Sequence, residues 1–244
     1  MEKISYVGHS AGGQMVQRYA ILSVFAALWD YDADIDLQFV IANPSSYTYL
    51  DDHRFMYACG NCTCSVRNCT CDQDCTEPPY TELAKPQKDS AGKNFPCYSP
   101  YYNRWPYGIG SFSEEKRGGH WIPYALRDGI LGVEKALRIY PKLHVVYLVG
   151  QNDTCNDGLP TCDVSCWKRE NFSKGEWPCF RNQMDSRCPA MLQGPCRRTR
   201  GRQYMKYLED LYGEPVHQLF EVPGIGHNAT GMFISPIGLK VLFG

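Results

Sequence analysis

The sequence lacks a charge imbalance, an apolar run of membrane-spanning length and any internal repeat. Its formal net charge is −1, which gives no electrostatic reason to expect a nucleic acid or an anionic membrane as a partner. The longest apolar candidate, around 21–28, is far shorter than the about 20 residues that a membrane-spanning helix needs. We therefore expect no nucleic-acid binding and no transmembrane segment. A small molecule is the expected partner, and no pattern indicates an oligomeric state.

The composition is that of a globular chain. Hydrophobic residues make up 43% of the 244 residues and charged residues 21%, which is enough for a sizeable core. The chain is long enough for one α/β domain or for two small domains. Periodicity is lost over about 59–97 and 155–196, where too few aliphatic residues occur to build a second core. We interpret both segments as cysteine-rich insertions into one domain, 1–244.

The chain opens with a strand-like run that leads into a Gly-His-Ser-Ala-Gly turn. Residues 4–7 favour β-structure, and a mostly apolar, proline-free run from 14 to about 29 predicts a buried helix. A G-x-S-x-G motif between a strand and a helix is the context of a nucleophile elbow, which holds a serine on a strained turn. We expect a positive φ at Ser10. Gly8 and Gly12 have no side chains, and we expect this to let the strand and the helix approach closely.

Three further strand-like runs follow, and helix-like periodicity separates them. Their bounds are 37–42, 143–149 and 217–222, and the helices are expected over 124–140, 204–212 and 236–243. Strands linked by crossover helices pair in parallel, and ligands collect at the carboxyl ends of parallel strands. The sequence therefore predicts an α/β fold, a mostly parallel sheet of about four strands flanked by helices.

One candidate for each role in nucleophilic catalysis lies at a predicted strand tip. A serine hydroxyl needs a base to take its proton, and the base needs an acid to hold its tautomer. Ser10 follows the first strand, Asp153 the third and His227 the fourth. Asp157, four residues further on, is the alternative acid. The backbone N–H of Ala11 is the candidate oxyanion donor, because it follows the serine at the start of a helix.

Other residues are candidates for a substrate pocket. His9 and Asn43 adjoin the tips of the first two strands. Trp105 and Tyr107 belong to an aromatic-rich stretch, 98–112, which either lines a pocket or packs the insertion against the domain. A run of arginines precedes the helix at 204–212, and we interpret it as a solvated face; it comprises Arg197, Arg198, Arg200 and Arg202.

Cysteines and glycosylation sequons indicate an oxidising, secretory environment. The chain has 13 cysteines, gathered in the two insertions, and five N-x-[ST] sequons, at Asn61, Asn68, Asn152, Asn171 and Asn228. A thiolate metal site is the rival interpretation, but the first cluster contains no histidine and C-x-C spacing fits structural zinc poorly. We expect disulfides of open connectivity, at least one cysteine outside them, no metal and no cofactor.

These motifs, taken in order, resemble the serine α/β-hydrolase superfamily, esterase- or lipase-like, from just before the nucleophile elbow to the carboxyl end. The order Ser, Asp, His along the chain is that of the superfamily. A set of such hydrolases shares the stretches 43–47 (NPSSY), 102–108 (YNRWPYG), 193–195 (QGP) and 222–227 (VPGIGH). The resemblance covers nearly the whole chain outside the insertions. It implies Ser10 as the nucleophile, Asp153 as the acid and His227 as the base.

The chain departs from this superfamily at its amino end. Such hydrolases carry four or more strands before the nucleophile, whereas nine residues precede Ser10 here, without a signal-peptide pattern. We therefore expect the chain to be the carboxyl-terminal portion of a longer secreted hydrolase, with its first strand as an unpaired edge. The loop that normally gives the second oxyanion donor is missing as well.

The expected function is hydrolysis of a small-molecule carboxylic ester through an acyl-enzyme intermediate. One alternative is a non-catalytic, hydrolase-like protein that binds or adheres through its cysteine-rich insertions. Another is a fragment that is inactive without the amino-terminal strands. Amide and polyester substrates stay open, because the shape of the pocket sets that choice.

Overall fold

A computed structural model of the protein describes its residues in ten ranges. These are 2–23, 35–57, 62–65, 68–71, 80–86, 101–110, 132–154, 184–185, 187–194 and 196–244. The alternative acid, Asp157, lies outside the described residues. So do the side chains of all cysteines except Cys196, which is a buried free thiol 3.1 Å from the Thr199 hydroxyl. The predicted disulfides therefore stay a prediction.

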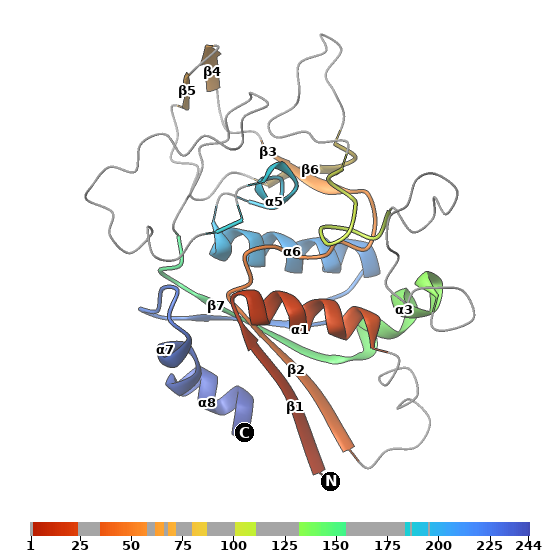
Figure 1. The fold of residues 1–244 in the computed structure, drawn as a ribbon, viewed down its shortest axis with the longest axis vertical. Helices are drawn as coiled ribbons and strands as arrows, with labels where there is room; N and C mark the ends of the chain where they lie inside the picture. The colour runs from red at the N-terminus through yellow and green to blue at the C-terminus, as the bar shows by residue number, and fades with distance from the viewer. Residues whose placement is uncertain are drawn as a thin grey trace.

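Four parallel strands form the central sheet, which confirms the predicted fold class (Figure 1). The spatial order is β1 (Glu2–His9), β2 (Ile35–Ala42), β7 (His144–Gly150) and β8 (Gln218–Val222). All three neighbouring pairs are parallel, with His9 beside Ala42, Ala42 beside Leu148 and Gly150 beside Val222. The carboxyl ends of all four strands therefore meet at one edge of the sheet.

Helices cover both faces of this sheet. They are α1 (Ala11–Leu22), α3 (Val133–Ile139) with a 3-10 turn at Tyr140–Lys142, and α6 (Arg197–Tyr212) on one face, and α7 (Ala229–Ile234) and α8 (Pro236–Phe243) on the other. A further short helix is α5 (Cys188–Met191). In the described part of the chain no helix is long and apolar enough to cross a bilayer.

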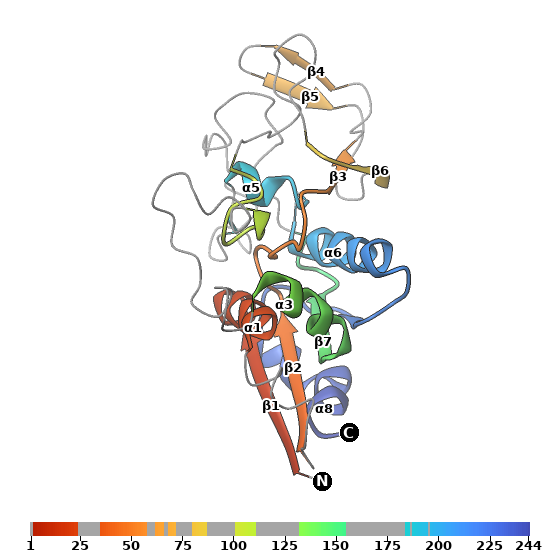
Figure 2. The same ribbon diagram turned by 90° about the vertical axis from the view of Figure 1, so that its right-hand side faces the viewer.

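The side chains of β2 and β7 alternate between two cores. Phe39, Ile41 and Tyr147 face the larger core, which α1 and α6 cover. Val40 and Leu148 face the smaller core under α7 and α8. Figure 2 shows α1 and α8 on opposite sides of the strands. Because strands buried on both faces read as continuous apolar runs, the sequence showed these two clearly.

Several predicted boundaries were wrong. Helix α1 begins at Ala11 and ends at Leu22, because Ser23 adopts an extended conformation, and 24–34 lies outside the described residues. Of the helix predicted over 124–140, the structure describes α3 from Val133 to Ile139, after Gly132 with a φ of +74°, and 124–131 lies outside the described residues. Helices α5 and α7 were not predicted at all; both have six residues or fewer, too short to show a 3.6-residue period.

The segment interpreted as an insertion without periodicity contains short strands. Strand β3 (Arg54–Tyr57) pairs with β6 (Tyr80–Ala84), and β4 (Cys62–Ser65) with β5 (Asn68–Cys71), both antiparallel. Strands of four or five residues carry too few alternating positions for the pattern to be recognised. Strands β4, β5 and β6 lie within 59–97 and β3 precedes it, and both two-stranded ribbons are outside the main sheet.

The arginine run is not a solvated face. Arg197 and Arg200 are 1% and 0% exposed, and both lie in the first turn of α6. Arg200 donates to the carbonyls of Gly194, Ser45 and Asp185, so it ties three segments to the helix. A buried guanidinium is tolerated only with such acceptors, and a sequence alone does not reveal them.

Close packing of β1, α1 and β2 depends on Gly8, as predicted, and on Gly13. The prediction that it also needs Gly12 without a side chain was wrong. A Cβ on Gly8 would lie 2.3 Å from the Gly12 carbonyl oxygen, and one on Gly13 2.6 Å from the Ala42 carbonyl oxygen. A Cβ on Gly12 would meet nothing within 4 Å. The helix thus approaches the sheet one residue later than the motif suggested.

Two substitutions at neighbouring positions test this packing. We expect Gly13→Ala to lower the free energy of unfolding by about 1–3 kcal/mol, because the methyl group overlaps a strand carbonyl. Gly12→Ala should raise it by about 0.5–1 kcal/mol, because alanine favours the helix and meets no neighbour. Urea denaturation of both variants measures the difference, and equal effects would contradict the packing described.

Candidate active site

Ser10 lies on a strained turn between β1 and α1. Its φ of 57° and ψ of −117° are unusual for a residue with a side chain, as the sequence predicted. It occupies the N-cap position of α1, where a serine hydroxyl normally accepts a hydrogen bond from a backbone N–H of the first turn. No such cap is made here. The hydroxyl points instead to a histidine.

Two hydrogen bonds join Ser10, His227 and Asp153. The Ser10 hydroxyl oxygen is 2.9 Å from Nε2 of His227, and Nδ1 of His227 is 2.8 Å from Oδ2 of Asp153. Because an ionised carboxylate only accepts, the ring proton lies on Nδ1 and the bare Nε2 accepts from the serine. The three residues that the sequence singled out are therefore in direct contact.

The carboxylate of Asp153 is buried and faces a buried cation. Asp153 and Arg197 are each 1% exposed, and their nearest side-chain atoms are 3.5 Å apart. The backbone N–H of Arg198 also donates to the Asp153 carbonyl, so the start of α6 holds the acid at two points. Nothing in the sequence distinguished Arg197 from the other arginines of the run, and its role was missed.

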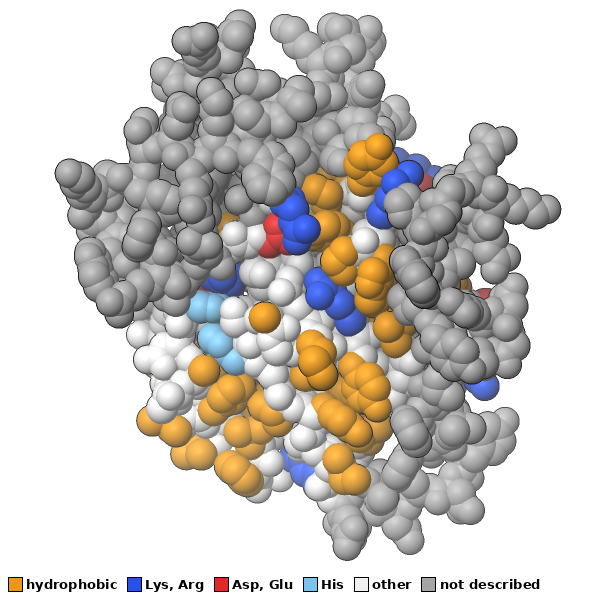
Figure 3. Space-filling model, viewed as in Figure 1, with side chains coloured by type: hydrophobic (Ala, Val, Ile, Leu, Met, Phe, Trp, Pro, Cys, Tyr) orange, Lys and Arg blue, Asp and Glu red, His pale blue; other side chains and the backbone are white. Residues whose placement is uncertain are grey.

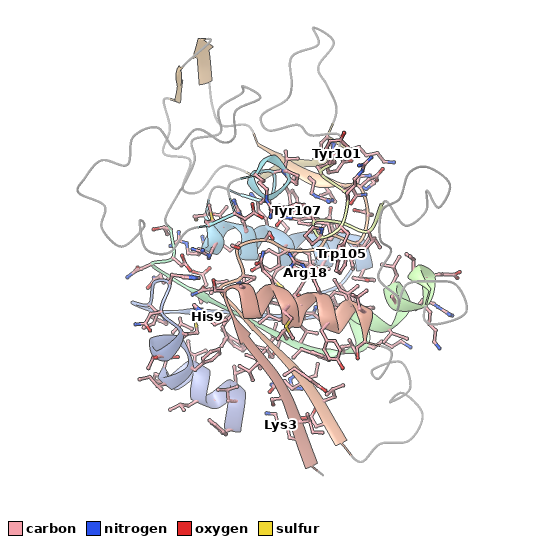
Figure 4. The ribbon with its side chains drawn as sticks, in the orientation of Figure 1. Lys3, His9, Arg18, Tyr101, Trp105 and Tyr107 are labelled. Carbon is pink, nitrogen blue, oxygen red and sulfur yellow. The ribbon has the colours of Figure 1, made fainter. Side chains whose placement is uncertain are left out.

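A second histidine lies beside the first. The rings of His9 and His227 are 4.6 Å apart, and Figure 4 shows His9 where β1 and β2 end beside the start of α1. Burial, and then the neighbouring His227, lower the pKa of His9 to about 4. His9 is therefore neutral at neutral pH. Figure 3 shows imidazoles (pale blue) at the surface on this face of the protein.

The other pocket candidates have structural contacts. Asn43 is fully buried, and its amide is used in bonds to the protein. Tyr107 is 6% exposed and donates its hydroxyl hydrogen to Asp185 at 2.7 Å. Trp105 packs against the larger core. Both aromatic side chains therefore have packing or hydrogen-bond contacts within the protein.

The backbone N–H of Ala11 begins helix α1, directly after Ser10. The first N–H groups of a helix have no intrahelical acceptor, and the partial positive charge of the helix terminus lies there.

No group of three or more His, Cys, Asp or Glu side chains able to hold a metal ion occurs among the residues that the structure describes.

Comparisons with known proteins give structural matches only. No protein-family model and no curated protein matches the sequence. Two solved structures match with a TM-score of 0.43 and 18% identity: poly(aspartic acid) hydrolase-1 from Sphingomonas sp. KT-1, over 97% of this chain, and LpqC, a poly(3-hydroxybutyrate) depolymerase from Bordetella parapertussis, over 99%. The chain spans 53% of the length of each.

The buried pair of Asp153 and Arg197 gives one prediction. Arg197→Met should lower the free energy of unfolding by about 3–5 kcal/mol, because it leaves a buried carboxylate without its cation. In the Asp153→Asn background the same substitution should cost much less. A double-mutant cycle by urea denaturation measures this coupling, and additive losses would show that the two side chains do not interact.

Two histidines with lowered pKa values, the buried His217 and the partly buried His9, predict a loss of stability in acid. His217 donates through Nε2 to the Tyr140 carbonyl at 2.9 Å, and burial lowers its pKa to about 4, as for His9. The unfolded chain takes up these protons near pH 6.5 and the folded chain only near pH 4, so stability falls as pH falls between these values.

For His217, which is 7% exposed, the expected loss is about 3 kcal/mol. His217→Gln keeps a donor for the Tyr140 carbonyl and removes this titration. Urea denaturation at pH values from 7 down to 4 should therefore show a shallower decline for the variant than for the wild type. Parallel curves would contradict the assignment.

Proposed function

We propose that the protein is a serine hydrolase acting on carboxylic esters, with Ser10 as nucleophile, His227 as general base and acid, and Asp153 as the supporting carboxylate. The observation that carries the proposal is the pair of hydrogen bonds through His227, at 2.9 Å and 2.8 Å. These distances are within the reach that proton transfer from a nucleophile to its base requires.

The first half of the proposed reaction forms an acyl-enzyme. The Ser10 oxygen attacks the ester carbonyl carbon while Nε2 of His227 takes the hydroxyl proton. The Asp153 carboxylate stabilises the resulting imidazolium. The tetrahedral oxyanion accepts from the Ala11 N–H at the start of α1. When the carbon–oxygen bond of the ester breaks, His227 returns the proton to the leaving alcohol, and the acyl group stays on Ser10.

Water completes the cycle. It attacks the acyl-Ser10 carbonyl while His227 takes one of its protons, and the same proton then passes to the Ser10 oxygen as the carboxylic acid leaves. Each oxyanion donor contributes about 10²–10³-fold to such rates, so the Ala11 N–H has a sizeable share in both halves.

The state of the serine hydroxyl favours catalysis over a binding scaffold. A serine at a helix N-cap normally stabilises the helix by about 1 kcal/mol when its oxygen accepts from the first turn. Ser10 makes no such bond and keeps a strained backbone. A purely structural serine gains nothing from this arrangement, whereas a nucleophile does, because strain of this kind collects at functional sites.

We also propose that the protein acts in the secretory pathway or outside the cell. This proposal rests on the 13 cysteines and the five sequons. The ester as substrate class rests on the superfamily resemblance of the sequence.

A fluorophosphonate probe tests the function, because it forms a covalent bond with activated serines. We expect the wild-type protein to be labelled at Ser10, as peptide mass spectrometry would show, and Ser10→Ala not to be labelled. Asp153→Asn should slow labelling by about 10³–10⁴-fold, since the imidazole then takes the wrong tautomer.

Ser5→Ala is the matched control. The Ser5 hydroxyl on β1 donates to the Gln38 side chain on the neighbouring strand β2, so the variant should label at the wild-type rate. Labelling of Ser10→Ala as strong as that of the wild type would overturn the assignment of the nucleophile.

A further inference from the structure

Asn43 is a buried residue in a strained conformation at the tip of β2. Its side chain is 0% exposed and its φ is +42°. Asparagine tolerates this left-handed region better than most residues, but it still costs conformational energy there. Within the described residues, the only other residue with a side chain and a positive φ is Ser10. Both strained residues follow neighbouring parallel strands.

The amide of Asn43 bonds to three separate segments of the chain. Its Oδ1 accepts from the Gly150 N–H at 2.8 Å. Its Nδ2 donates to the Gly226 carbonyl at 3.2 Å and lies 3.4 Å from Nε2 of His9. These partners stand one to three residues from Asp153, His227 and Ser10. A single side chain thus reaches each segment that carries a member of the proposed triad.

The polarity of these partners fixes the orientation of the amide. A backbone N–H only donates and a carbonyl only accepts, so Oδ1 faces Gly150 and Nδ2 faces Gly226. The second Nδ2 hydrogen then points to His9, whose Nε2 must accept it. The proton of the neutral His9 ring therefore lies on Nδ1.

The backbone around Asn43 makes two further contacts with the site. The Asn43 N–H donates to the Leu148 carbonyl, and the Ala42 carbonyl accepts from the N–H of Ser10, both at 2.9 Å. Gly150 also lies close to the loop after β8 that contains His227, because a Cβ on Gly150 would be 2.4 Å from the Ile225 carbonyl oxygen. Asn43 is therefore surrounded by the carboxyl ends of β1, β2 and β7 and by the loop after β8.

We propose that Asn43 is a positioning residue, whose single buried amide sets the spacing of the three segments that carry Ser10, Asp153 and His227. This inference rests on the proposed hydrolase function. It assigns Asn43 a role in orienting the triad rather than in contacting substrate. Displacement of reacting groups by about 1 Å costs on the order of 10²-fold in rate, so such a residue acts on turnover without touching substrate.

Another buried amide provides the comparison. Gln193 is also 0% exposed, and it bonds to the N–H and the carbonyl of one residue, Tyr47. Its loss removes two buried hydrogen bonds, but these hold a single segment. Gln193→Ala is therefore a control: it should lower the stability of the fold without changing the distances between Ser10, His227 and Asp153.

The experiment compares Asn43→Gly, Asn43→Asp and Gln193→Ala by thermal melting and by the rate of fluorophosphonate labelling. Asn43→Gly removes the amide and suits the positive φ, so it isolates the loss of the three bonds from strain. We expect labelling about 10–100-fold slower in both Asn43 variants, at a temperature where each is folded. Gln193→Ala should label within about twofold of the wild type.

Asn43→Asp adds a readout that a structural role alone would not move. The carboxylate keeps an acceptor for Gly150 and places a negative charge beside His9 and His227, among the charges of Asp153 and Arg197. It favours the protonated base, so the pH of half-maximal labelling should rise by about one unit.

The outcomes separate the two proposals. No labelling of the wild type contradicts the proposed function. Labelling of the wild type together with unchanged rates in Asn43→Gly, or an equal loss in Gln193→Ala, overturns the role of Asn43 alone. If Asn43→Asp does not fold, the rate of Asn43→Gly decides. Nitrogen-15 NMR of His9 gives a check independent of activity: Nε2 should be unprotonated in the wild type, and its signal should move in Asn43→Gly.

Discussion

The imidazole of His227 makes two hydrogen bonds at once, and the rest of the site is arranged to keep both. One bond joins it to a hydroxyl on the turn after β1, and the other joins it to a carboxylate after β7. Neither residue is near His227 in sequence. Only the parallel register of the sheet, which brings the carboxyl ends of all strands to one edge, puts them within reach.

Buried polar groups gather at this edge and bond to one another. Asp153 faces Arg197, and Asn43 bonds to the tip of β7, to the Gly226 carbonyl after β8 and to His9. Burying such groups costs free energy unless they are hydrogen-bonded, so these partners also fix their geometry. Below this edge the sheet packs between the two apolar cores.

The sequence predicted those parts of the molecule that short-range patterns encode. Continuous apolar runs showed the buried strands β2 and β7, and Gly213 correctly marked the end of α6 with a φ of +75°. The G-x-S-x-G motif predicted the turn that holds Ser10, and the predicted ends of two strands indicated Asp153 and His227 as its partners. These features depend on residues close in sequence or on the general geometry of parallel sheets.

Contacts between residues far apart in the chain could not be predicted from the sequence. The burial of Arg197 and Arg200 depends on acceptors that other segments supply, so a charge run looked like a solvated face. The position of Asn43 at a strand tip could be recognised in the sequence, but its three bonding partners could not. Gly13 rather than Gly12 meets the sheet because the crossing of α1 over Ala42 is a tertiary feature.

The central claim is that Ser10 attacks a carbonyl carbon and carries the acyl group. It is tested most directly by mixing the protein with a p-nitrophenyl ester, quenching in acid within the first turnover and mapping the acyl mass by peptide mass spectrometry. We expect an acyl group on the peptide that contains Ser10, formed as nitrophenol is released. Release of nitrophenol with no acyl group on that peptide, or with one on another residue, would contradict it.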